Sequence, residues 1–182
     1  ESYGYLAVDF VRDKDAVSSC YFFAEMADWL REKGRTLFDF LNEIYSSYGL
    51  YVDDLMSMTM KGIEGMEKIG AIMRHYRETR PGVMGGIKVA RIADIRERRV
   101  YDLDAGSEGP ATGLPQSDVL QFFLKDGSKV TMRPSGTEPK IKFYFSARRA
   151  LEGASVEQAR GELKGRIEAL KKDIVDTVQS LG

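Results

Sequence analysis

The sequence has few of the residues that form disulfides or act as general bases: its 182 residues include one cysteine and one histidine. Cys20 has no partner for a disulfide within the chain, and we expect it to pack inertly on the apolar face of a helix. His75 stands between Arg74 and Tyr76 near a predicted helix end, where a surface residue is expected more than a general base. No Ser-His-Asp triad can be assembled around it. The chain is therefore expected to supply binding groups and no nucleophile.

An excess of charge of one sign and long apolar runs are also lacking. Lys and Arg total 27 and Asp and Glu total 28, so no overall field favours nucleic acid or an anionic membrane. The charged stretch 96–99 has no interleaved aromatic residue on which a base could stack, and a solvated turn is expected. No apolar run has the length of a membrane span or the position of a signal peptide. We expect a globular, cytoplasmic protein whose 43% hydrophobic residues suffice for a core.

Paired carboxylates occur twice, at Asp53-Asp54 and at Asp102 and Asp104. Neither pair comes with the further oxygen ligands that a divalent cation needs. Capped turns or solvated strand edges are expected there, and no metal site is predicted within the chain.

Residues 1–49 are predicted to be the end of an α/β domain. Residues 3–11 are rich in aromatic and β-branched residues, which indicates a loop leading into a strand. Apolar residues then recur at spacings of three and four in two stretches, which predicts two helices ending at Gly34 and Gly49. Their apolar stripes exceed what the two helices can bury on each other. The candidate N-caps are Asp13 or Asp15 for the first helix and Thr36, with Asp39 in the first turn, for the second.

Residues 50–182 are predicted to form a complete α+β domain of antiparallel strands with two helices packed on the sheet. Asp126-Gly127 is a strong turn signal between two of the strands, and Ser155 with Gln158 forms a capping box before the last helix. Residues 105–117 collect Gly, Pro and Ser, which predicts a loop or flap. Residues 51–60 are expected to form a strand or an extended linker. The other expected strands are 87–95, 119–124, 129–132 and 141–145, and the expected helices are 63–73 and 156–181.

The stretch from Arg133 to Lys140 lies between two of these strands and has the composition of an oxyanion-binding loop. Pro134, Gly136 and Pro139 are expected to keep it out of helix and ladder. Gly136 can adopt a positive φ, so that successive backbone N–H groups converge on one point.

The side chains of the same loop are suited to phosphate. Ser135 and Thr137 offer hydroxyl donors, and the planar guanidinium of Arg133 matches two phosphate oxygens. Lys140 and Lys142 either support the site electrostatically or form a solvated strand end. The alternative for the whole loop is a polar hairpin connection.

This octet, continued by Ile141-Lys142-Phe143-Tyr144, resembles the C-terminal phosphate-binding loop of the α-D-phosphohexomutases, the phosphoglucomutase and phosphomannomutase superfamily. A second resemblance lies at the start of the chain. There Glu1-Ser2-Tyr3-Gly4-Tyr5-Leu6 and Val11-Arg12-Asp13-Lys14-Asp15 are similar to the sugar-recognition loop of the family and the segment after it.

The resemblance implies a four-domain enzyme of which this chain is a C-terminal fragment. Residues 1–49 would end the α/β sugar-binding third domain, and 50–182 would form the phosphate-binding fourth domain, with a TATA-box-binding-protein-like fold. The phosphoserine and a Mg²⁺ held by aspartates would lie in the first two domains, and the acidic residue of the sugar-recognition loop, two positions before Ser2, would lie just before Glu1. Its implied site residues are Ser2 for sugar hydroxyls, Lys14 for the ligand, and Arg133, Ser135, Gly136 and Thr137 for phosphate.

The implied activity of the whole enzyme is interconversion of hexose 1-phosphate and hexose 6-phosphate through a phosphoserine and glucose 1,6-bisphosphate. The fragment alone is expected to be inactive. The form of the first loop is most similar to the phosphoglucomutase and phosphopentomutase branch, and glucose phosphate is the expected substrate. The alternatives are a phosphopentomutase or a noncatalytic phosphate-binding module, which the sequence of the N-terminal domains would distinguish.

Overall fold

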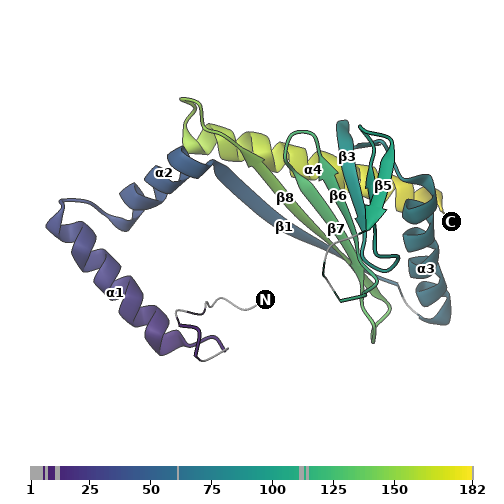
Figure 1. Cartoon of the computed structure of the whole chain (residues 1–182), viewed down its shortest axis with the longest axis horizontal. Coiled ribbons are helices and arrows are strands. Elements are labelled where there is room, and N and C mark those ends of the chain that lie inside the picture. The colour runs from purple at the N-terminus through teal and green to yellow at the C-terminus, as the bar shows by residue number, and fades with distance from the viewer. Residues whose placement is uncertain are drawn as a thin grey trace. The chain divides into compact units, whose positions relative to one another are not determined.

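The computed structural model describes residues 6, 8–10, 13–60, 62–110, 113 and 115–181 (Figure 1). The chain falls into two compact units, Glu1–Tyr48 and Gly49–Gly182. The assignment of the first unit to the end of a sugar-binding domain stays a prediction.

The first unit contains the two predicted helices, α1 (Ala16–Glu32) and α2 (Leu37–Tyr48). Asp15 is the N-cap of α1, because its carboxylate accepts the backbone N–H groups of Val17 and Ser18, each at 3.0 Å. The predicted strand at 3–11 falls largely outside the described residues. Those that are described, Leu6 and residues 8–10, form loop and bends.

The helices of the first unit leave much apolar surface exposed. Thr36 and Asp39 cap α2 reciprocally: Thr36 N–H donates to Asp39 Oδ2 at 2.8 Å, and Asp39 N–H donates to Thr36 Oγ1 at 3.2 Å. Leu30 is the buried residue of α1, whereas Phe38 of α2 is 78% exposed. Cys20 is exposed as well, so the expectation that it packs inertly was wrong. The unit is too small to cover both apolar stripes.

The second unit is built on an eight-stranded antiparallel sheet. The strands follow the order β1-β8-β7-β6-β3-β4-β5, and β2 pairs with β3 beside this path. The predicted α+β class with an antiparallel sheet is confirmed. The strands are β1 (Leu50–Thr59), β2 (Val83–Met84), β3 (Ile87–Asp94), β4 (Arg99–Asp102), β5 (Ser107–Pro110), β6 (Leu120–Leu124), β7 (Lys129–Pro134) and β8 (Lys140–Arg149).

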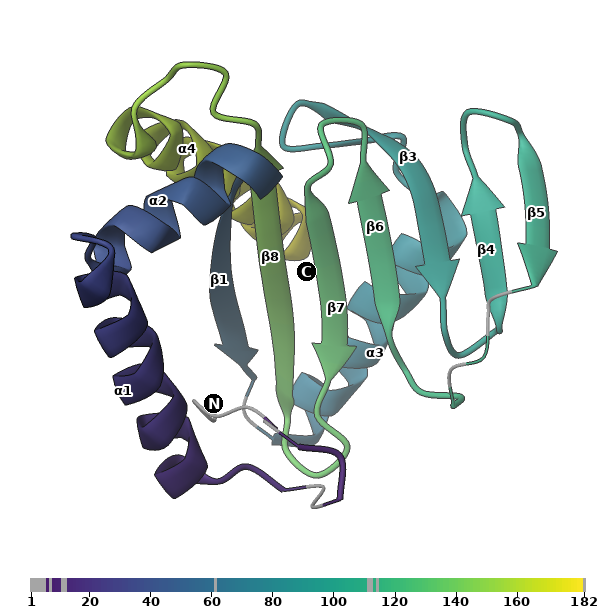
Figure 2. The same ribbon diagram turned by 60° about the vertical axis from the view of Figure 1, so that its left-hand side comes forward.

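Two helices, α3 (Gly62–Thr79) and α4 (Val156–Ser180), cover the same face of this sheet (Figure 2). The predicted capping box starts α4: Ser155 Oγ accepts Gln158 N–H at 3.2 Å, and Gln158 Oε1 accepts Ser155 N–H at 3.3 Å. Alternate residues of each strand point to the helices and are buried. In β8 these are Ile141, Phe143, Phe145 and Ala147, and in α4 they are Ala159, Leu163, Ile167, Leu170, Ile174 and Val178.

Two expectations about loops were wrong. The stretch 105–117 contains a strand, β5, which pairs with β4 at the edge of the sheet. Its Gly109 and Pro110 hide the strand in the sequence, yet both are tolerated at an edge. Pro134, expected outside the ladder, is the last residue of β7 and lies in register with Ile141. A proline without an N–H costs no ladder bond at a strand end.

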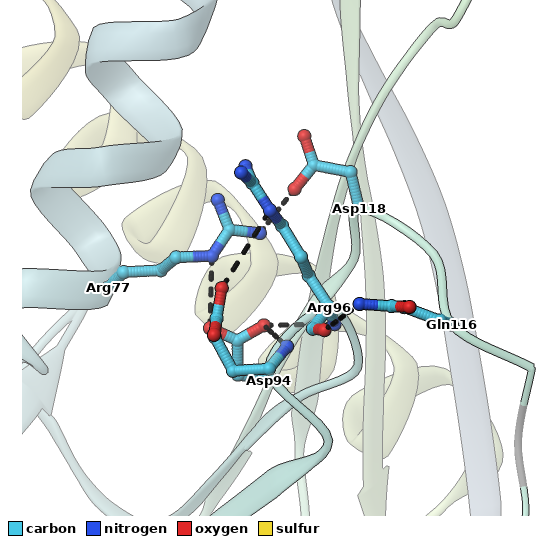
Figure 3. A network of polar contacts seen from close by, with 6 residues as sticks. Arg77, Asp94, Arg96, Gln116 and Asp118 are labelled. Carbon is cyan, nitrogen blue, oxygen red and sulfur yellow. Dashed lines mark hydrogen bonds and ion pairs between the residues drawn. The ribbon is translucent and has the colours of Figure 1, made fainter.

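A partly buried ion-pair network ties α3 to the sheet (Figure 3). Arg77 of α3 donates from Nε to Asp94 Oδ2 at 2.9 Å and pairs through Nη2 with Asp118. Asp94, which is 2% exposed, also accepts Arg96 N–H at 3.0 Å. Gln116 Nε2 in turn donates to Arg96 O at 2.8 Å. The network fixes the turn after β3 and the segment that leads into β6.

Candidate functional site

The loop between β7 and β8 is closed by backbone hydrogen bonds. Ser135 N–H donates to Lys140 O at 2.7 Å, and Lys140 N–H donates to Glu138 O at 2.7 Å. Pro139 O accepts Met60 N–H at 2.9 Å, which ties the loop to the residue after β1. The loop is therefore held at the end of the sheet from both sides.

The hydroxyl of Ser135 organises the tip of the loop. Its Oγ accepts the backbone N–H groups of Thr137 at 3.4 Å and Glu138 at 3.3 Å. Both distances exceed the usual range for N–H···O bonds, so these bonds are weak. An oxyanion carries more negative charge than a hydroxyl oxygen and makes shorter, stronger bonds to such donors. Two N–H groups thus converge on one point, which Ser135 Oγ occupies.

Gly136 departs from the expectation for this loop. It does not take a positive φ, so the predicted left-handed step is absent from this position. A Cβ built on Gly136 would have no atom within 4 Å. The glycine is therefore not needed for the turn itself, and its effect is to leave open space above the backbone.

Three cations surround the loop. Arg133 lies directly opposite Lys142 in the β7–β8 ladder, so both project from the face of the sheet that carries neither α3 nor α4. Lys140 precedes Lys142 by two residues and shares this face. Within the described part of the chain, none of the three has an ion-pair partner. This charge, which no ion pair neutralises, lies beside the Ser135 hydroxyl and two weakly bonded N–H groups, and the combination suits an anion.

The structure brings together Arg133, Ser135, Gly136 and Thr137 of the predicted site residues. Lys14 belongs to the first unit, where it directly precedes the N-cap of α1 and donates its backbone N–H to Asp13 Oδ1 at 2.7 Å. Ser2 lies outside the described residues. The roles of Ser2 and Lys14 toward a ligand stay predictions.

The described residues offer no set of metal ligands. Nowhere among them do three or more His, Cys, Asp or Glu side chains gather as a metal site requires. The Mg²⁺ implied by the resemblance therefore has no fitting set of ligands among the described residues. Among the helices described here, none combines the length and apolarity needed to cross a bilayer.

Comparison of the sequence with known proteins identifies the family that the two loops resemble. The family described as phosphoglucomutase/phosphomannomutase, C-terminal domain, matches residues 78–163. Phosphoglucomutase from Staphylococcus haemolyticus is 44% identical over 147 residues, which cover 80% of this chain and 26% of the relative. Phosphoglucomutase from Staphylococcus aureus (strain MRSA252) is 42% identical over 146 residues, with the same coverage.

A solved structure shows the same fold. The open form of the exocytosis-sensitive phosphoprotein pp63/parafusin, a phosphoglucomutase from Paramecium, superposes with a TM-score of 0.53 at 15% identity. The match covers 91% of this chain and 28% of that protein.

The antiparallel α+β fold and the sequence matches together define the class of protein, a domain of the phosphoglucomutase/phosphomannomutase C-terminal type. The chain is a member of the phosphohexomutase (phosphoglucomutase/phosphomannomutase) family and corresponds to its C-terminal part. It spans about a quarter of the length of the relatives it matches.

Proposed function

We propose that this chain is the phosphate-holding part of a phosphoglucomutase-type enzyme, which interconverts hexose 1-phosphate and hexose 6-phosphate. The observation that carries the proposal is the cluster of Arg133, Lys140 and Lys142, unpaired within the described residues, around the loop 135–139. The names of the relatives support glucose phosphate as the substrate.

Each group has a distinct role toward a phosphate dianion. Arg133 would donate two parallel N–H bonds to two phosphate oxygens, whereas Lys142 would act as a point charge. The N–H groups of Thr137 and Glu138, which converge on Ser135 Oγ, would donate to a third oxygen, with the Ser135 hydroxyl rotating to donate as well. The site would recognise the geometry of phosphate and not the sugar.

This selectivity fits the reaction. The phosphoserine of the whole enzyme would donate phosphate to the free hydroxyl, and the bisphosphorylated sugar would turn over before the other phosphate returns to the serine. One phosphate must be held in either orientation while the other reacts. A site that holds phosphate alone accepts both orientations and fixes the reacting end in place. Ser2 and Lys14 would contact the sugar and the ligand from the first unit.

The test is a backbone NMR titration of the 182-residue chain with glucose 1,6-bisphosphate. We expect shifts centred on Ser135, Gly136 and Thr137, and their loss in Arg133→Ala. Arg148→Ala is the matched control, because Arg148 is an exposed cation on the same sheet face, six residues beyond Lys142 in β8. The control should bind like the unsubstituted chain.

Three outcomes are informative. Equal weakening by Arg133→Ala and Arg148→Ala would point to diffuse charge attraction and count against a built site. Absence of shifts at millimolar bisphosphate would overturn independent phosphate binding by this chain. Phosphate binding by this chain, together with a lack of mutase activity in the full-length protein, would favour a noncatalytic phosphate-binding module.

A further inference from the structure

A second polar site lies on the same face of the sheet as the three cations, and it does not depend on the function proposed above. A hollow of about 450 Å³ opens over β3, β4, β5 and β6. This volume lies in the range of small-ligand pockets, about 300–1,000 Å³. The loop 135–139 does not line it.

The strand register explains the hollow. One row across the sheet consists of Gln121, Ala93, Val100 and Gly109, in neighbouring positions of β6, β3, β4 and β5. Ala93 and Gly109 have almost no side chain, so this row forms a low floor. The next row carries Phe123, Arg91 and Asp102, whose larger side chains form the wall.

The wall is ordered before any ligand arrives. The guanidinium carbon of Arg91 lies 4.3 Å from the centre of the Phe123 ring, which holds the planar group in one orientation. Asp102 is fixed because its Oδ1 accepts the N–H groups of Asp104 at 3.0 Å and Ala105 at 2.9 Å. A ligand would therefore meet preorganised groups and pay little entropy to order them.

Several polar atoms that line the hollow stay available. In the part of the chain that the structure describes, Arg91 has no ion pair although Asp102 is its direct cross-strand neighbour, and the Gln121 amide has no hydrogen-bond partner. The hollow thus presents guanidinium donors, a carboxylate acceptor, and an amide that is both.

The charge of the site selects the class of ligand. Arg91 and Asp102 cancel each other, and the nearby Glu108 is paired with Arg99. A phosphate attracted by Arg91 would be repelled by Asp102, whereas at the loop 135–139 the cations Arg133, Lys140 and Lys142 outnumber the one carboxylate, Glu138. A neutral polyol offers a donor and an acceptor at every hydroxyl, which matches the mixture of Arg, Asp and Gln. We propose that this hollow is a binding site for a neutral saccharide.

The test uses NMR titrations of the 182-residue chain with maltotriose and, separately, with inorganic phosphate. We expect maltotriose to shift the amides of Arg91, Ala93, Asp102 and Gln121 at millimolar concentration, and phosphate to leave them unchanged. Gln121→Leu keeps the volume but removes the amide, so the affinity should fall by about tenfold.

A filling variant tests the location. Ala93→Leu fills the floor of the hollow and should abolish the shifts, whereas Ser146→Leu adds a similar side chain on the same face of β8, outside the hollow, and should not. The far-ultraviolet spectrum and melting temperature of each variant report whether it folds. Unchanged binding in Gln121→Leu and Ala93→Leu, no response to maltotriose, or equal shifts with phosphate would each overturn the proposal. Failure here leaves the phosphate titration at Ser135 unaffected, so the two proposals are tested separately.

Discussion

Arg133 and Lys142 stand directly opposite each other in the β7–β8 ladder, and neither has an ion-pair partner among the described residues. Side chains at such positions start about 5 Å apart, and like charges there repel. Other cations of the same unit are neutralised, for example Arg77 by Asp94 and Arg166 by Asp126. The sheet end therefore keeps a repulsion that a bound dianion would relieve.

Replacing one of these two charges should separate stability from binding. In Lys142→Gln we expect the free energy of unfolding without ligand to stay within about 0.5 kcal/mol of the original or to rise, because a repulsion is removed. The rise in melting temperature that glucose 1,6-bisphosphate produces should shrink, since Kd increases by about tenfold. Thermal melts with and without the bisphosphate measure both. A loss of more than about 1 kcal/mol without ligand would show that Lys142 is structural.

In the ion-pair network around Asp94, we expect replacement of Arg77 and replacement of Asp118 to lower the stability by unequal amounts. Arg77→Met leaves the Asp94 carboxylate, 2% exposed, without its counter-ion, and should cost about 3 kcal/mol of unfolding free energy. Asp118→Asn removes a partner whose side chain is 42% exposed, and should cost about 1 kcal/mol or less. Urea unfolding of the two variants measures the difference. Similar losses in both would contradict the view that burial of Asp94 sets the cost.

Local signals in the sequence predicted most of this fold. The caps Asp15, Thr36 and Ser155 mark helix starts because a cap acts on N–H groups two or three residues away. The turn at Asp126-Gly127 is likewise a local signal. Strand β5 was missed because pairing with β4, and not its own composition, makes Ser107–Pro110 a strand.

The candidate site was predictable in composition and less so in geometry. The alternation of apolar and polar residues in the flanking strands predicted that the loop 135–139 connects two strands, here β7 and β8. Arg133 and Lys142 share a face of the sheet, as this alternation requires. The φ of Gly136 was mispredicted, because the sequence gives what glycine permits and not what the loop uses. Arg77 had no signal at all, since Asp94 and Asp118 are 17 and 41 positions away.

The pair of Asp54 and Lys171 predicts how stability depends on pH. Lys171 Nζ donates to Asp54 Oδ2 at 2.7 Å, and this bond, with Leu55 N–H, holds the pKa of Asp54 below its ordinary 3.8. As the pH falls, Asp54 therefore binds a proton at higher pH in the unfolded chain than in the folded chain. Its contribution to stability is present above pH 3.8 and is lost as the pH falls further. The same bond raises the pKa of Lys171 above 10.5, so its contribution is complete below 10.5 and is lost at higher pH.

Asp54→Asn tests this window. The stability difference between the unsubstituted chain and Asp54→Asn should be constant through neutral pH and should shrink below 3.8. Urea midpoints measured across the acid range give the difference at each pH. A difference that stays constant down to the acid transition would mean that Asp54 does not titrate with folding.

Gly136 offers a test of the loop that leaves the fold intact. Its φ is not positive and a Cβ would meet no atom within 4 Å, so Gly136→Ala should change the unfolding free energy by less than about 0.5 kcal/mol. The control is Gly127→Ala, where φ is +84° and a Cβ would lie 3.2 Å from the Arg148 side chain; there we expect a loss of about 1 kcal/mol or more. If phosphate approaches the backbone at Gly136, the added methyl group stands in its path, and the affinity for glucose 1,6-bisphosphate should fall in Gly136→Ala alone. Calorimetric titration of both variants measures this, and full affinity in Gly136→Ala would place the phosphate away from the loop tip, toward the side chains of Arg133 and Lys142.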